Sequence, residues 1–190
     1  MKARDNPFAV ERIHCLQFRP LAATWPELLA RWSAMNHRGA IVGPEGHGKT
    51  TMLLELGALL PRNDWRVRSA LLRRTKSNAW RELPPDLFTD LGPRDCILLD
   101  GAEQLNYFAW RRFLRFAQPA GGLIVTVHQP GRLRTWFRCE TTLELFNDLV
   151  EQLLGSIDDS VRSVNRHLFE KYEGNLRLAL REWYDLYAAM

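Results

Sequence analysis

Eight consecutive residues, 43–50, carry the pattern in this sequence that is most specific for a chemical task. The segment reads GPEGHGKT and fits G-x-x-x-x-G-K-[ST] at every fixed position. Backbone N–H groups of such a loop can surround a phosphate, and Gly46 and Gly48 allow close approach and positive φ. Lys49 would reach the β- and γ-phosphates, and the Thr50 hydroxyl would bind Mg²⁺. The pattern therefore predicts a nucleoside triphosphate and Mg²⁺ as ligands.

The flanking sequence has the elements that this loop needs. Residues 40–42 form a short apolar run that predicts a buried strand, and residues 50–60 predict a helix that ends before Pro61. A helix N-terminus adds a favourable dipole for an anion. A chance glycine-rich turn that binds nothing is the alternative. The predicted nucleotide contacts are Gly43, Pro44, Glu45, Gly46, His47, Gly48, Lys49, Thr50 and, at the α-phosphate, Thr51.

A second chemical candidate is the acid that ends the run CILLD at residues 96–100. The run is continuously apolar, which is typical of a parallel strand buried on both faces. Asp100 follows the phosphate loop by about fifty residues, which suits an acid that holds Mg²⁺ directly or through water. The alternative is a turn or a helix cap.

Alternating strands and helices must position these groups. The alternation predicts an α/β fold with a parallel sheet and helices on both faces, in which ligands lie at the carboxyl ends of the strands. The phosphate loop, Asp100 and His128 all fall at such ends. Further strands are expected at 66–73, 123–128 and 141–146, and helices at 25–36, 106–118 and 148–154, after an irregular arm at 1–23.

The pattern changes to helices after Gly155, with helical stretches at 160–172 and 176–187. We expect these helices to form a small lid. The predicted domain organisation is an N-terminal arm and helix at 1–38, a P-loop nucleotide-binding core at 39–150 and a helical lid at 151–190.

Four segments, GPEGHGKT, ILLDGAEQL, IVTVHQP and EGNLRLAL, make the chain resemble P-loop ATPases of the AAA+ class and, more loosely, STAND ATPases. They extend over residues 39 to about 185. The resemblance implies a three-layer P-loop NTPase sandwich that binds ATP. It also implies that His128, or failing it Thr126, is the sensor 1 residue, and that Arg177 is the sensor 2 arginine of the lid. An ordinary strand-end histidine and a solvated helix arginine are the alternatives.

One departure from the AAA+ pattern bears on hydrolysis. That pattern has Glu directly after the strand-end Asp to orient the attacking water, whereas this chain has Gly101 there. Glu103 is three residues after Asp100 and could take this role, or it could be a first-turn acid favoured by the helix dipole. If Glu103 does not act, hydrolysis would be slow.

Two segments mix arginines with aromatic residues, at 110–116 and 132–138. Both suit nucleic acid through phosphate contacts and base stacking. In the first, the aromatic spacing also fits burial on the sheet with arginines facing water. In the second, the resemblance adds that Arg132, Arg134 or Arg138 could reach the nucleotide of a neighbouring subunit in a homo-oligomer.

Composition sets outer limits on function. The chain has 190 residues, 46% hydrophobic and 25% charged, with a net charge of +4. That basicity permits nucleic-acid binding without establishing it. No apolar run approaches a membrane span and no secretory signal is visible, while three scattered cysteines suggest a reducing compartment. We therefore expect a cytoplasmic protein without a membrane partner.

The functional expectation is a Mg²⁺-dependent ATPase that drives a conformational change on a protein or nucleic-acid partner, DNA included. A non-hydrolysing nucleotide switch or adaptor is the main alternative. A small-molecule kinase is weaker, because the lid segment argues against it. An ABC-type ATPase is disfavoured because no LSGGQ-like segment precedes Asp100. ATP is preferred over GTP through the resemblance, since no N-K-x-D segment is present.

Overall fold

Two units make up the fold, and the chain passes between them four times. The computed structural model describes residues 6–18, 20–21, 23–73 and 79–189. One of the two units, here called the sheet unit, holds Arg19–Gly43 and Lys49–Arg138. The second, the helical unit, holds Met1–Phe18, Pro44–Gly48 and Cys139–Met190. The domain boundaries given above at residues 38/39 and 150/151 stay a prediction.

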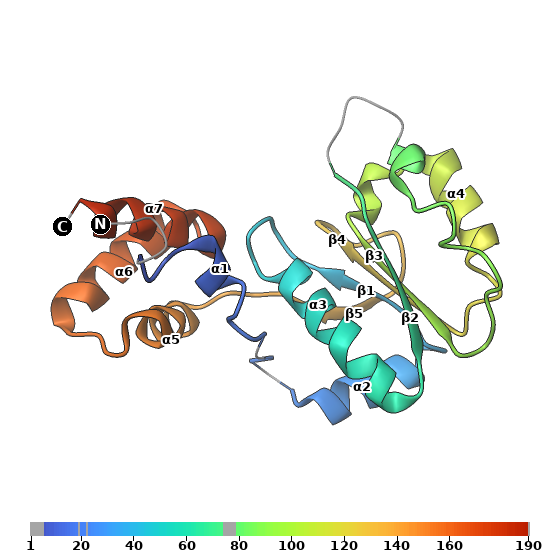
Figure 1. Cartoon of the computed structure of the whole chain (residues 1–190), viewed down its shortest axis with the longest axis horizontal. Helices are drawn as coiled ribbons and strands as arrows, with labels where there is room; N and C mark the ends of the chain where they lie inside the picture. The colour runs from blue at the N-terminus through green and yellow to red at the C-terminus, as the bar shows by residue number, and fades with distance from the viewer. Residues whose placement is uncertain (1–5, 19, 22, 74–78, 190) are drawn as a thin grey trace. The chain divides into compact units, whose positions relative to one another are not determined.

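The sheet unit contains a parallel sheet of five strands in the order β2-β3-β4-β1-β5 (Figure 1). The two central strands, β3 and β4, are buried at every position, as their continuous apolar sequences predict. The α/β class and the parallel sheet are therefore confirmed. The strands are β1 (Arg38–Val42), β2 (Arg66–Leu71), β3 (Asp95–Asp100), β4 (Gly122–Val127) and β5 (Thr135–Arg138).

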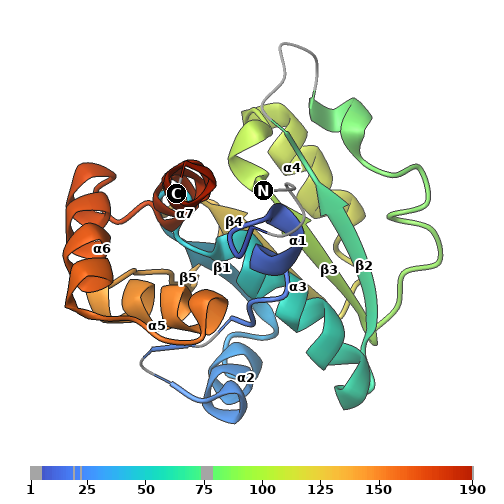
Figure 2. The ribbon, with the colours of Figure 1, turned by 60° about the vertical axis from the view of Figure 1, so that its left-hand side comes forward.

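Helices cover both faces of this sheet (Figures 1 and 2). On one face, Trp110 and Phe113 of α4 (Tyr107–Phe116) pack into a buried cluster with strand residues such as Leu99 and Val125. On the other lie α2 (Trp25–Ser33) and α3 (Lys49–Leu59). On this face, a Cβ on Gly122 of β4 would lie 2.9 Å from the Trp32 ring of α2. Only glycine therefore fits at position 122 beneath α2. Three layers result, as expected for a P-loop NTPase-like fold.

Short 3₁₀ turns connect several of these elements. They cover Leu60–Asn63, Ala79–Glu82 and Ala102–Gln104. The polar sequence at 74–85 predicts a loop or a short helix, and residues 74–78 of it lie outside the described residues.

The fifth strand lies earlier in the chain than the sequence predicted. Residues 141–146 were expected to be extended, but α5 already begins at Leu143. The Thr142 hydroxyl accepts a hydrogen bond from the Leu145 N–H at 3.1 Å and so caps that helix. The strand is instead Thr135–Arg138, whose residues pair with β1. A β-branched threonine followed by alternating apolar positions thus served here as a helix cap.

The helical unit is built around α5 (Leu143–Leu154), α6 (Asp159–Lys171) and α7 (Leu176–Ala188), with the short α1 (Val10–Ile13) beside α7 (Figure 1). Phe8 stacks on Trp183 with ring centroids 5.3 Å apart. Asn165 is buried and bridges the helices: it accepts from the Trp183 indole at 2.7 Å and donates to Asn147 at 2.8 Å. The two C-terminal helices predicted from the sequence are present.

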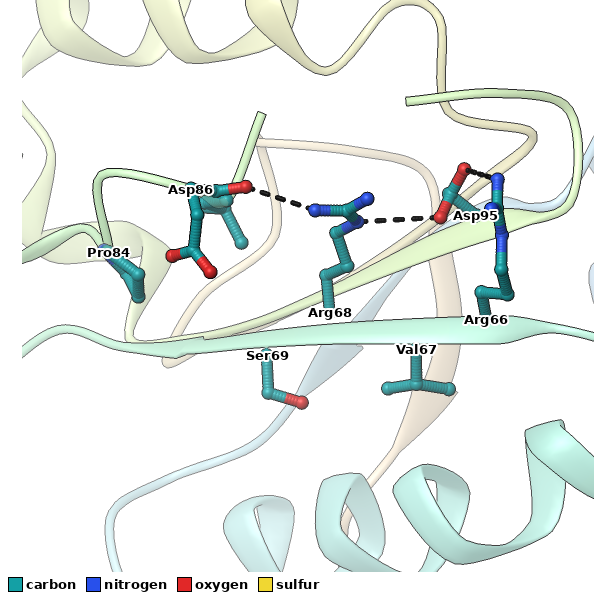
Figure 3. Close-up of a pocket in the computed structure, with 8 residues that line it drawn as sticks. Arg66, Val67, Arg68, Ser69, Pro84, Asp86 and Asp95 are labelled. Carbon is teal, nitrogen blue, oxygen red and sulfur yellow. Dashed lines mark hydrogen bonds and ion pairs between the residues drawn. The ribbon is translucent and has the colours of Figure 1, made fainter. Parts of the chain in front are cut away.

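An ion-pair cluster secures the edge strand β2. Arg66 and Arg68 of β2 point toward Asp95 of β3, whereas Val67 and Ser69 point the other way (Figure 3). Asp95 Oδ2 lies 2.6 Å from Arg66 and Oδ1 lies 3.4 Å from Arg68. These side chains line a pocket of about 390 Å³.

The Asp95 carboxylate is fully satisfied within this cluster. Burial acts to raise the pKa of Asp95, but the Gly92 N–H, which donates at 2.7 Å, and the two guanidiniums together hold that pKa below its ordinary value. Arg68 also donates to the Asp86 carbonyl at 3.0 Å. Because the two guanidiniums and the Asp95 carboxylate are paired with one another, we interpret the pocket as structural.

Across the described residues, no helix is both long and apolar enough to cross a membrane.

Candidate functional site

The acid predicted at the end of β3 lies against the start of the helix that follows the phosphate loop. Thr50, the second residue of α3, donates from its hydroxyl to Asp100 Oδ2 at 2.7 Å. Thr50 is exposed and Asp100 is buried. The structure therefore brings together the two residues that the sequence assigned to Mg²⁺.

Thr126 of β4 fixes the other side of this carboxylate. Its buried hydroxyl donates to Asp100 Oδ1 at 2.5 Å and accepts from the Gly101 N–H at 2.8 Å. The sequence named Thr126 as a substitute sensor and gave no sign of this anchoring role. The signal that could have revealed it is the single polar residue in the apolar run LIVTV, because a buried hydroxyl needs a partner.

Gly101 occupies a position at which no other residue fits. Its φ is +82°, and a Cβ there would lie 2.5 Å from the carbonyl oxygen of Leu72. That carbonyl belongs to the backbone, so it cannot move aside as a flexible side chain would. The absence of Glu after Asp100 is therefore enforced by the path of the chain as it leaves β3.

Glu103 and His128 lie next to each other. Glu103 follows Gly101 in the 3₁₀ turn Ala102–Gln104, and its Oε1 is 3.3 Å from Nε2 of His128 just after β4. Glu103 Oε2 is buried and has no hydrogen-bond partner among the described residues. A buried carboxylate oxygen without a partner is unusual in a folded protein, which marks this pair as a candidate site.

Two further residues of the motif begin α3. Lys49 is its first residue and is buried, and Thr51 is half-buried. At the other end of the motif, the Gly43 N–H donates to the Val127 carbonyl at 3.2 Å, which ties the end of β1 to β4.

The central part of the loop, Pro44–Gly48, belongs to the helical unit by its contacts. Gly46 and Gly48 have φ of +78° and +81°, as expected from the motif. A Cβ on Gly46 would lie 1.9 Å from Oδ1 of Asn175, the N-cap of α7. The loop tip thus packs directly under the N-terminus of the last helix.

Arg177 of α7 also faces this loop. Its Nη1 lies 3.6 Å from Glu45 Oε1, and both side chains are largely exposed. An exposed pair at that distance contributes little to stability. It does place the predicted sensor 2 arginine beside the predicted phosphate loop. His47 Nδ1 lies 3.0 Å from the Glu45 carbonyl, and a Cβ on Gly174 would come within 3.5 Å of the His47 ring.

A comparison with solved structures agrees with the fold described here. No protein-family model matches the chain, and no curated protein sequence matches it. Among 25 matching chains of solved structures is a point mutant of RuvB from Thermotoga maritima. The TM-score is 0.54 and the identity 15%, and the match covers 84% of this chain. The chain spans 61% of the RuvB chain. At this identity the likeness concerns the fold alone, and it is consistent with a P-loop NTPase-like α/β fold.

Proposed function

We propose that this chain binds ATP with Mg²⁺ and hydrolyses it to drive a conformational change on a protein or nucleic-acid partner. The observation that carries the proposal is the 2.7 Å hydrogen bond between Thr50 and Asp100. It joins the hydroxyl of the phosphate-loop motif, which follows β1, to the acid at the end of β3. In the sheet, β3 lies two strands away from β1.

The donor set fits Mg²⁺. This ion prefers hard oxygen ligands and is commonly held by one or two protein oxygens together with water and substrate phosphates. Thr50 Oγ1 and Asp100 Oδ2 would be those oxygens. Thr126 keeps Asp100 oriented, and Lys49 would neutralise phosphate charge. When bound, the ion would polarise the phosphoryl oxygens.

Glu103 is the proposed general base. Its Oε1 is held near His128, and its Oε2 has hydrogen-bonding capacity that no described residue uses. A carboxylate so arranged can accept a hydrogen bond from the attacking water and take its proton. His128 would then orient Glu103 and sense the γ-phosphate from the same position.

The loop tip and α7 would respond to the nucleotide. Arg177 pairs weakly with Glu45 in this structure, and phosphate is a stronger partner for a guanidinium than an exposed carboxylate is. We therefore propose that Arg177 exchanges Glu45 for the nucleotide, which would transmit nucleotide binding to the lid helices.

A switch without meaningful turnover is the second candidate, and Gly101 favours it. The position that holds the catalytic Glu in the AAA+ pattern cannot carry a side chain here. If Glu103 does not orient water, ATP would be bound and held rather than consumed.

Phosphate release from purified protein with Mg·ATP tests the proposal. Lys49→Ala should lose nucleotide binding, and Glu103→Gln should bind fluorescent ATP normally while turnover falls at least a hundredfold. Glu144→Gln, another glutamate in the first turn of a helix, is the matched control and should keep full activity. If the wild type binds ATP without turnover, the ATPase proposal fails and the nucleotide switch remains. If the wild type does not bind ATP, both candidate functions are refuted.

A further inference from the structure

The outer face of α4 has an unusual composition. Six of its ten positions are exposed, and they form two adjacent rows along the helix. All six are aromatic residues or arginines. We call them the α4 surface: Tyr107, Phe108, Arg111, Arg112, Arg115 and Phe116.

The exposed aromatic rings are not explained by packing against the sheet. Trp110 and Phe113 fill that role and are buried. Tyr107, Phe108 and Phe116 remain 65%, 81% and 43% exposed. The first two rings contact each other edge to face, with centroids 5.6 Å apart. Contiguous exposed apolar groups of this kind mark interaction sites more often than isolated ones do.

Positive charge is concentrated in the part of the sequence that contains this helix. Residues 104–139 contain six arginines and no Asp or Glu, whereas the whole chain has a net charge of +4. Three of the six, Arg111, Arg112 and Arg115, belong to the α4 surface. A fourth, Arg132, lies over the Trp110 ring of α4 at 5.4 Å and donates to the Leu105 carbonyl.

The arginines of the α4 surface are available for an anion. Within the part of the chain that the structure describes, Arg111 and Arg115 form no ion pair with an acid. Arg112 lies over the Trp80 ring at 4.4 Å and the Phe116 ring at 5.6 Å. Such stacking holds a guanidinium in place while its N–H groups still face solvent.

We propose that the α4 surface binds single-stranded nucleic acid. Single strands are held by a positively charged track combined with exposed rings on which bases stack, and both features are present on this helix. From Tyr107 to Phe116 the helix rises about 13.5 Å. At about 3.4 Å per stacked nucleotide, that length suits about four nucleotides.

This inference narrows the partner class that the proposed function leaves open, and it does not depend on ATP binding or hydrolysis. None of the six residues belongs to the candidate nucleotide site. Binding should therefore occur without nucleotide and should survive Lys49→Ala. A failure of ATP binding would not affect this inference. Likewise, a failure of nucleic-acid binding would not affect the proposed ATP binding.

The test is fluorescence anisotropy of labelled dT15 and rU15, without nucleotide, at several salt concentrations. Arg111→Ala/Arg115→Ala should weaken binding at least tenfold at 0.1 M salt and lower the slope of log K against log salt by about 1.4, or about 0.7 per phosphate contact. Phe108→Ala should weaken binding roughly tenfold and leave that slope unchanged, because stacking releases few counterions.

Matched controls separate the α4 surface from general basicity. Arg162 and Arg166 are also exposed and one turn apart, on α6, so Arg162→Ala/Arg166→Ala removes the same charge elsewhere. Leu54→Ala on α3 removes another exposed apolar side chain. Both controls should bind within twofold of wild type. Unaltered circular dichroism and melting would show that every variant is folded.

Four results would overturn the inference. They are no binding by the wild type, equal losses in the α4 and α6 double variants, tighter binding to a 15-base-pair duplex than to dT15 and rU15, and binding to phosphatidylserine vesicles in preference to either oligonucleotide. Binding to dT15, to rU15 or to both would support it and would show which sugar the surface accepts.

Discussion

Replacing Thr126 by valine should destabilise the protein and weaken Mg·ATP binding together. The substitution keeps the side-chain shape but removes the hydroxyl that donates to Asp100 and accepts from the Gly101 N–H. A hydrogen bond to a charged group contributes about 1.5–3 kcal/mol, and an unpaired buried N–H costs about 1–3 kcal/mol. The added methyl group returns about 0.8 kcal/mol of apolar transfer.

The net expectation for Thr126→Val is a loss of about 3 kcal/mol in the free energy of unfolding. For a chain of this size that loss corresponds to a melting temperature about 6–12 °C lower. Urea unfolding followed by circular dichroism measures the first quantity and calorimetry the second. Titration with Mg·ATP then reports whether Asp100 still holds its position.

Thr126→Ser is the control for Thr126→Val, because it keeps the hydroxyl and loses a methyl group. It should lose only about 1 kcal/mol and bind Mg·ATP as the wild type does. A Thr126→Val protein whose free energy of unfolding lies within about 0.5 kcal/mol of the wild-type value would show an effect typical of surface substitutions. In that case the Thr126 hydroxyl does not anchor the Asp100 carboxylate, and this reasoning is wrong.

Three further substitutions test other parts of the structure. Gly101→Ala should cost at least about 3 kcal/mol of unfolding free energy, since positive φ and contact with the Leu72 carbonyl both oppose a Cβ; stability near wild type would contradict the backbone path. Asp95→Asn should cost about 1–2 kcal/mol at pH 7, a modest value because Arg66 is 66% exposed and water screens it. Since the folded pKa of Asp95 is lowered, its contribution is complete above the unfolded pKa of about 4 and is lost as pH falls through the folded pKa. The unfolding free energies of the wild type and Asp95→Asn, measured by urea titration, should therefore converge in acid. A difference that grew as the pH fell would contradict a lowered pKa for Asp95. Asn175→Ala removes the side-chain oxygen that accepts from the Leu178 N–H at the start of α7 and should lower stability by about 1 kcal/mol, whereas Asn175→Ser should restore most of it in the same melts.

The fold was predictable where burial produces a simple pattern. β3 and β4 are buried on both faces and therefore read as continuous apolar runs, and their carboxyl ends were expected to carry polar groups. The spacing of Trp110 and Phe113 likewise predicted the buried side of α4. The fifth strand was misplaced because Thr142 is a good strand residue by propensity, while its local hydrogen bond makes it a helix cap.

The residues of the candidate site were predictable from the sequence, but the hydrogen bonds and steric contacts between them were not. The motif identifies Thr50, and the apolar run identifies Asp100, but the hydrogen bond between them depends on the register of three strands. The steric requirement at Gly101 depends on the Leu72 carbonyl, which is distant in sequence. Residue types alone cannot reveal such a contact, because backbone atoms are the same at every position.

The packing of Asn175 against Gly46 has a consequence for the order in which this protein is made. About 130 residues separate the two positions in the chain. At a synthesis rate of about 5–20 residues per second, the loop leaves the ribosome roughly 6 to 26 seconds before its packing partner. All strands of the sheet are complete by Arg138, so the sheet unit can form during this interval. The phosphate loop gains its contact with Asn175 only once α7 has left the ribosome, and nucleotide binding that needs this contact cannot begin earlier.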